Sequence, residues 1–161
     1  MISTSITVKP DPLTFGCICE GFVYKLKVYL YNHGTVMDRF RIELSSDNDA
    51  DPNTIISDYR ISNVAPGMGT SFHMELRAIA VFQTSYSLVI RAGSTKQSDT
   101  INITAVILPR DVFRKVAKSV ILRDKGIYAP GVKCLGLLAG DPGGGEDLLL
   151  LVAPQRSTQR H

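Results

Sequence analysis

The chain of 161 residues has no apolar run close to the roughly 18 residues that a membrane-spanning helix requires. Its first residues, 1–5, carry neither the positive charge nor the apolar stretch of a secretory signal peptide. Hydrophobic residues make up 44% and charged residues 20%, which is typical of a soluble globular protein. We therefore expect no transmembrane segment, a location in the cytoplasm or cytoskeleton, and one domain with an appendage.

Cysteine is scarce, with three residues in the chain. Cys17 and Cys19 lie two positions apart in an extended segment, where their Cα atoms would be about 6.6 Å apart, near the upper limit for a disulfide. Cys134 is remote from both in sequence, and the scattered histidines do not form the spaced ligand pairs of a zinc site. We expect free thiols in a reducing compartment and no metal centre.

Sequence signatures of catalysis and of phosphate binding are also missing. The chain contains no Gly-x-Ser-x-Gly nucleophile elbow, and the glycine-rich stretch 140–145 lacks the Gly-Lys-Ser/Thr ending of a phosphate loop. An acidic loop at 47–51 resembles the start of a calcium loop, but Pro52 stands at the position that requires glycine. We therefore expect no enzyme, no cofactor and no small-molecule substrate.

A strong excess of one charge is missing from most of the chain. Residues 1–109 hold nine basic and ten acidic residues, a net of −1, and residues 110–161 hold nine and five, a net of +4, which together give the formal +3. The positive excess therefore belongs to a C-terminal segment. Because the larger part is nearly neutral, the charge argues against a nucleic-acid-binding surface.

The first 109 residues do contain repeated alternation of apolar and polar residues. Residues 22–31 alternate over their whole length, with Lys25 and Lys27 on the face opposite the apolar set. Turn-forming residues separate such segments, and no helical period interrupts them. The sequence therefore predicts an all-β fold over residues 1–109: an Ig-like antiparallel β-sandwich of seven to eight strands, with a short edge strand near Tyr59 and Ile61.

After Pro109 the pattern changes to a helical spacing of apolar residues, beginning with Val112, Phe113 and Val116. The sequence predicts a basic amphipathic helix over 110–125, with Asp111 in its first turn. This helix either packs its apolar stripe on the sandwich or docks its basic face on an acidic partner or anionic lipid. The residues considered for partner binding on it are Arg114, Lys115 and Lys118.

From residue 126 onward the periodicity is lost. Seven of the 13 glycines fall in residues 126–161, and a short leucine run has no partner pattern. We interpret this segment as a disordered Gly/Leu-rich tail.

Short motifs in the sandwich segment resemble the ASH domain, which is named for the abnormal-spindle protein, a centrosomal coiled-coil protein and Hydin, and is related to the major sperm protein domain. The resemblance covers roughly residues 4–108 and rests on Leu13, Phe15, Gly16, Leu30, Asn32, Gly34, Phe40, Ile42, Pro66 and Gly67. These residue types suit scaffold roles. Phe15 would enter the core where Gly16 lets the chain bend, Asn32 would bond nearby backbone at a strand end, and Pro66-Gly67 would form a turn.

ASH domains are found mostly in proteins of cilia, flagella and centrosomes, where they act as non-enzymatic interaction modules. The resemblance therefore implies a protein–protein interaction or structural module of a ciliary or flagellar axoneme, for instance its central apparatus, or of a centrosome or basal body, with axonemal or microtubule-associated proteins as partners. The alternative is an adaptor of the major-sperm-protein type that binds short acidic peptides near membranes, with Lys25 and Lys27 as first candidates. The missing signal peptide disfavours an extracellular adhesion domain.

Overall fold

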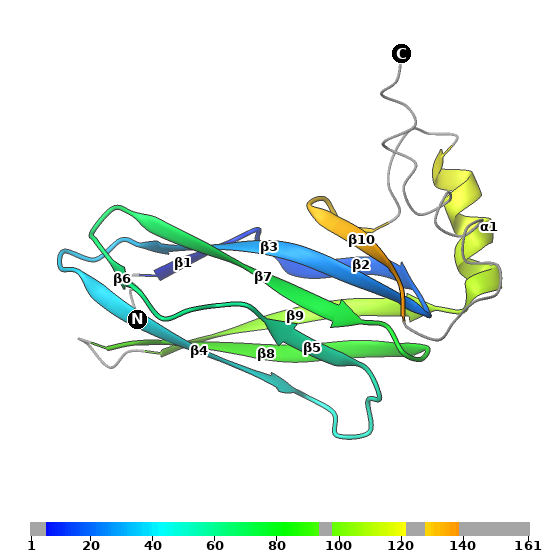
Figure 1. Cartoon of the computed structure of the whole chain (residues 1–161), viewed down its shortest axis with the longest axis horizontal. Helices are drawn as coiled ribbons and strands as arrows, with labels where there is room; N and C mark the ends of the chain where they lie inside the picture. The colour runs from blue at the N-terminus through cyan, green and yellow to red at the C-terminus, as the bar shows by residue number, and fades with distance from the viewer. Residues whose placement is uncertain (1–5, 94–97, 122–127, 139–161) are drawn as a thin grey trace, which may run out of the picture.

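The computed structural model describes residues 6–93, 98–121 and 128–138, and within them ten strands form two packed sheets with one helix at an end (Figure 1). One sheet has the order β1 (Ile6–Lys9), β3 (Phe22–Asn32), β7 (Gly69–Arg77), β5 (Thr54–Ser57), with β10 (Val132–Leu137) also paired to β3. The other has the order β2 (Leu13–Cys19), β9 (Ser98–Leu108), β8 (Phe82–Ala92), β4 (Asp38–Ser46), β6 (Asn63–Val64). The predicted all-β sandwich is confirmed.

The strand count exceeds the predicted seven to eight because the first strand is divided between the sheets, β6 is a separate strand of two residues, and β10 lies beyond residue 109. β1 pairs with β3, whereas β2 pairs with β9 in the opposite sheet. Pro10 and Pro12 lie between them, and proline cannot donate to a strand ladder. The β2–β9 pair is also parallel, while the other strand pairs of the described residues are antiparallel.

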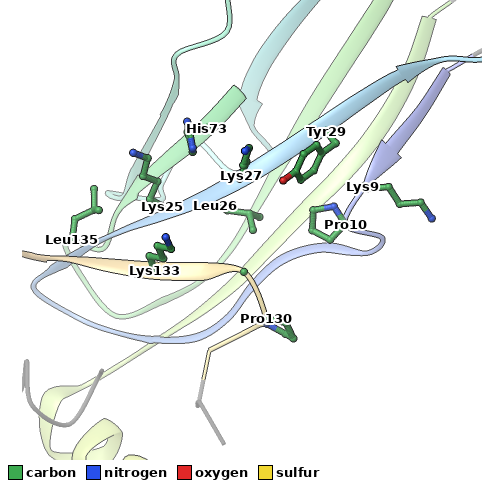
Figure 2. Close-up of a pocket in the computed structure, with 11 residues that line it drawn as sticks. Lys9, Pro10, Lys25, Leu26, Lys27, Tyr29, His73, Pro130, Lys133 and Leu135 are labelled. Carbon is green, nitrogen blue, oxygen red and sulfur yellow. The ribbon is translucent and has the colours of Figure 1, made fainter. Parts of the chain in front are cut away.

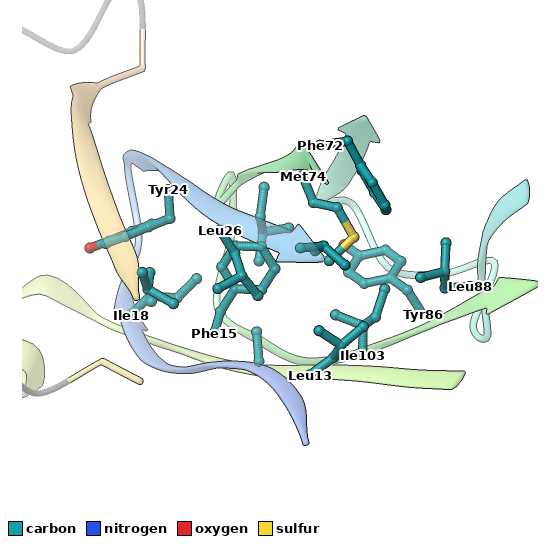
Figure 3. Packing of buried hydrophobic residues seen from close by; sticks show 14 of the residues in the cluster. Leu13, Phe15, Ile18, Tyr24, Leu26, Phe72, Met74, Tyr86, Leu88 and Ile103 are labelled. Carbon is teal, nitrogen blue, oxygen red and sulfur yellow. The ribbon is translucent and has the colours of Figure 1, made fainter. Parts of the chain in front are cut away.

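The core is formed by the inward faces of both sheets, as the alternation predicts. The alternating apolar residues of β3, from Phe22 to Leu30, are at most 1% exposed. Figure 3 shows Phe15, Leu26 and Met74 pointing into the space between the sheets, toward Ile103. Burial of this apolar surface is the main force holding the sheets together.

The predicted edge strand near Tyr59 and Ile61 is wrong: both residues lie in the connection after β5. Tyr59 has a different role, since its hydroxyl donates a hydrogen bond to the Phe40 carbonyl over 2.7 Å and its ring meets the Phe72 ring edge-on at 5.2 Å. One side chain thus fastens this connection to both sheets.

The helix α1 (Arg110–Ile121) begins where predicted, with Asp111 in its first turn; the predicted continuation to residue 125 lies outside the described residues. Only part of the expected apolar stripe packs on the sandwich. Phe113 is fully buried, but Val112 and Val116 are 39% and 37% exposed. The helix stands at one end of the sandwich, where it meets β2 (Figure 1). No helix of the described chain is long and apolar enough to cross a bilayer.

The segment after residue 126 is not wholly the tail that the sequence predicts, because residues 132–137 form β10. Tyr128 first makes a bridge with Gly16 of β2, and β10 then pairs antiparallel with the beginning of β3. Val132 is buried in the core, and burial of its apolar side chain helps to hold β10 against β3. The remainder of the predicted tail, 139–161, lies outside the described residues.

A candidate partner-binding groove

The residues that carry the family resemblance form the scaffold. Leu13, Phe15, Leu30 and Phe40 are buried in the core, and Ile42 is half-buried against it. Their side chains face the opposite sheet, so they are not available to a partner. Their burial fits the scaffold roles expected from the sequence.

Asn32 ends β3 with a set of buried hydrogen bonds. Its side-chain nitrogen donates to the carbonyls of Val36 (3.0 Å) and Val64 (2.8 Å), and its side-chain oxygen accepts from the amide of Gly34 (2.8 Å). The backbone carbonyl of Asn32 accepts from the amide of Gly67 (2.7 Å), in the turn after β6. Asn32 therefore links the end of β3 to the connection that begins at Gly34 and to the turn at Gly67.

A groove of about 570 Å³ lies on the outer side of the β3 sheet, in the space between β1 and β10 (Figure 2). It exists because these two strands share one edge of β3 without meeting. β1 pairs with β3 from Asn32 back to Tyr29, and β10 pairs with it from Leu26 back to Phe22. The residues lining the groove are Lys9, Pro10, Lys25, Leu26, Lys27, Tyr29, His73, Pro130, Gly131, Lys133 and Leu135.

Four lysines from three strands make this groove basic: Lys9, Lys25, Lys27 and Lys133. None of the salt bridges found among the described residues includes any of the four. Glu75 lies opposite Lys25 on β7, but its carboxylate is paired with Arg77 (3.5 Å). The groove therefore has an excess of positive charge within a sandwich whose sequence is nearly neutral.

Two groove residues have fixed partners. The ammonium of Lys27 lies 5.1 Å from the centre of the Tyr29 ring, a cation–π distance. His73 Nδ1 lies 3.2 Å from Asp58 Oδ2, and the His73 backbone amide donates to Asp58 Oδ1 over 2.6 Å. The hydrogen bond from the His73 backbone amide is the main reason that the pKa of the Asp58 carboxyl lies below its usual range. Asp58 therefore lies beside the groove, and His73 already engages it.

The structure brings together some predicted partner-binding residues and separates others. Lys25 and Lys27 share the groove, as their common strand face predicts, whereas Arg114 and Lys115 are exposed on α1 away from it. The side chain of Lys118 lies outside the described residues. Sequence reasoning missed Lys9 and Lys133; the alternation of Val132-Lys133-Cys134 is the signal that could have indicated a strand there.

The described residues contain no group of three or more His, Cys, Asp or Glu side chains placed to hold a metal ion. All three cysteines are free thiols. Burial raises the pKa of the Cys19 thiol from 9.0 to about 12, so this thiol stays protonated and weakly nucleophilic near neutral pH.

Solved structures with a similar arrangement include the ASH / PapD-like domain of human CEP192 (PapD-like domain 7), at 9% identity and a TM-score of 0.49, covering 66% of this chain and 87% of that one. WR4, a Caenorhabditis elegans MSP family member, has 9% identity and a TM-score of 0.45 over 66% of this chain and 100% of its own. Salmonella alpha-2-macroglobulin has 16% identity and a TM-score of 0.55 over 68% of this chain and 7% of its own, which shows that the chain shares the fold of a small part of that protein.

No curated protein sequence matches the chain. The profile of the flagellar-associated PapD-like family does match it, over residues 3–107. The matched stretch contains the sandwich from β1 to all but the last residue of β9 and excludes α1 and β10. The chain therefore belongs to the flagellar-associated PapD-like family.

Proposed function

We propose that the chain is a non-catalytic protein-interaction module of a ciliary or flagellar axoneme, or of a centrosome, and that it binds acidic segments of neighbouring proteins in the basic groove. The flagellar-associated family supports the setting. The observation that carries the binding mode is the groove itself, in which four lysines line one surface without a salt bridge among the described residues.

The groove suits an extended acidic segment for physical reasons. Its lysines follow the strand direction, with Lys25 and Lys27 two positions apart on β3 and Lys133 opposite Lys25. An extended chain repeats its side chains with the same period, so alternate carboxylates can each meet a lysine. Tyr29 and Leu135 add exposed apolar surface at 38% and 50% exposure, which favours apolar residues flanking the acidic ones.

The binding test compares two double variants with equal charge change. Lys25→Glu with Lys27→Glu reverses charge in the groove, and Arg114→Glu with Lys115→Glu reverses it on α1. The groove variant should lose about tenfold or more of its affinity for an acidic peptide, and the helix variant should stay close to the unmodified chain. The affinity of the unmodified chain should fall as salt is added. Equal losses in both variants would refute the groove as the binding site.

The cellular setting is tested by locating a tagged chain in ciliated cells and labelling its neighbours by proximity. We expect the axoneme, the basal body or the centrosome, with axonemal or microtubule-associated proteins among the neighbours. A chain found at none of these three structures would refute this setting.

A second candidate function is a membrane-proximal adaptor that binds short acidic peptides, and the same groove favours it because it supplies a basic patch on the sandwich itself. The localisation experiment separates the two functions. Recovery of the chain at membranes together with proteins that carry acidic motifs, and not at the axoneme, would support the adaptor.

A further inference from the structure

β10 occupies an edge of the sandwich from outside the family-matched part of the chain. The family match ends at residue 107, whereas β10 covers the edge of β3 over Phe22 to Leu26. β10 is therefore not part of the family-matched sandwich, although it covers this edge. A strand edge carries backbone donors and acceptors and is a template for any extended segment.

The side chains of β10 fit this edge imperfectly. Lys133 lies directly opposite Lys25 across the β10–β3 pair, and like charges in such positions are destabilising. The register shifts between Cys134 and Gly136, which interrupts the ladder. Val132 is the one residue of the strand that is fully buried.

β10 also leaves part of the edge without a partner strand. Lys27 and Val28 pair with β7 on one side, but neither β1 nor β10 pairs with them on the other. A segment entering from the groove could pair with β3 continuously from Val28 to Phe22. It would place outward side chains opposite Lys25 and Lys27.

We propose that the β3 edge is a strand-acceptor site, at which an extended acidic segment of a partner protein pairs with β3 in place of β10. The partner carries a carboxylate opposite Lys25 and another opposite Lys27. Between them it carries a β-branched apolar residue opposite Leu26, in the space that Val132 fills in the free chain. This inference rests on the proposed function, because it specifies how the groove holds its acidic ligand.

The register explains why an acidic segment would replace β10. Replacing β10 by the partner strand substitutes a carboxylate for Lys133 opposite Lys25, so a repulsion becomes an attraction. It also adds a second pair of opposite charges at Lys27. The buried apolar contact of Val132 is retained by the β-branched residue of the partner. The additional pairing at Lys27 and Val28 extends the ladder.

The experiment measures hydrogen exchange of residues 132–137 and of β1 in the full chain, with a synthetic peptide in which Glu alternates with Val as the probe. A peptide with Gln in place of Glu is the control. The Glu peptide should bind and remove the protection of residues 132–137 while β1 stays protected. Binding with β10 still protected overturns strand exchange and leaves the proposed function intact. No binding of the Glu peptide overturns the proposed function, and equal binding of the Gln peptide overturns the acidic specificity.

Two charge-matched variants test the mismatch between Lys133 and Lys25, first in the free chain and then by peptide binding. Lys133→Glu creates an opposite-charge pair with Lys25, so exchange of residues 132–137 should become about threefold to tenfold slower. The Glu peptide should also bind this variant more weakly. Lys9→Glu makes the same change of charge on β1 and should leave the exchange of residues 132–137 unaltered. Equal effects of the two variants on that exchange would overturn the proposal.

Discussion

A Cβ atom at Gly16 would lie 2.7 Å from the backbone nitrogen of Ala129. Gly16 belongs to β2 and Ala129 to the segment that leads into β10, so an early strand and a C-terminal segment meet at a residue without a side chain. Gly16 also has φ of +73°, a conformation that favours glycine. The Ala129 amide donates to the Phe15 carbonyl over 3.2 Å, which fixes the contact.

The substitution Gly16→Ala should lower stability through both backbone strain and this contact. Gly67→Ala is the matched control, because φ is +79° there but nothing lies within 4 Å of the added Cβ. We expect about 1–2 kcal/mol for Gly67→Ala and a further loss of about 1–3 kcal/mol for Gly16→Ala. Urea unfolding monitored by circular dichroism measures both. Similar losses in the two variants would show that the C-terminal segment does not press on Gly16.

Asn32→Ala should destabilise the sandwich by about 1–3 kcal/mol, because it leaves the buried carbonyl of Val64 without its donor. Asn102 gives the comparison, since it is exposed and accepts one bond from Ser85. Asn102→Ala should stay within about 0.5 kcal/mol of the unmodified chain. The free energies of unfolding in urea measure both changes. A small loss of stability in both variants would mean that water replaces the hydrogen bonds of Asn32.

Phe113→Ala should cost about 3–5 kcal/mol, the range for removing a buried aromatic ring. The adjacent Val112 is 39% exposed, and Val112→Ala should change stability by about 0.5 kcal/mol or less. Thermal unfolding of the two variants provides the measurement. If both retain the original midpoint, α1 contributes nothing to the core.

Alkaline pH should destabilise the fold through Cys19. Burial raises its pKa from 9.0 to about 12, so the unfolded chain releases this proton at lower pH than the folded chain does. The stabilisation is complete below pH 9.0 and is lost as pH rises from there toward about 12. Tyr86, whose pKa burial raises from 10.0 to about 12, adds to the loss above pH 10.0.

Urea midpoints measured at increasing pH test this sign. Cys19→Ala should reduce the decline that begins near pH 9.0, whereas Cys17→Ala should keep it because Cys19 is still present. A midpoint that stays constant through this range in the unmodified chain would contradict the assignment.

Much of the sandwich could be predicted because burial imposes a period of two. The inward set of β3 from Phe22 to Leu30 is apolar without exception, and Lys25 and Lys27 fall on the outer face as the alternation requires. Asn32 could be placed because a buried strand end needs a side chain that bonds backbone. These signals are local, so one sequence is enough to carry them.

The groove could not be predicted because it depends on strand register. Lys9 and Lys133 lie far apart in sequence, and only pairing of both strands with β3 brings them together. β10 could not be predicted because it is short and contains Gly136, so it does not stand out from the glycine-rich sequence around it. The sequence could not show how much of the apolar stripe of α1 is buried, because periodicity does not report how much surface the end of the sandwich offers. Of the first apolar residues of α1, Phe113 alone is buried.

The parallel pairing of β2 with β9 determines how the domain bears mechanical load. The two strands run in the same direction, with Leu13 beside Ile103 and Cys19 beside Leu108. A tensile force that draws the start of β2 and the end of β9 apart therefore acts along both strands in opposite senses. The inter-strand hydrogen bonds are loaded in shear and must yield together, whereas a hairpin pulled at its open end separates one bond at a time. A sandwich joined this way resists stretching along the chain.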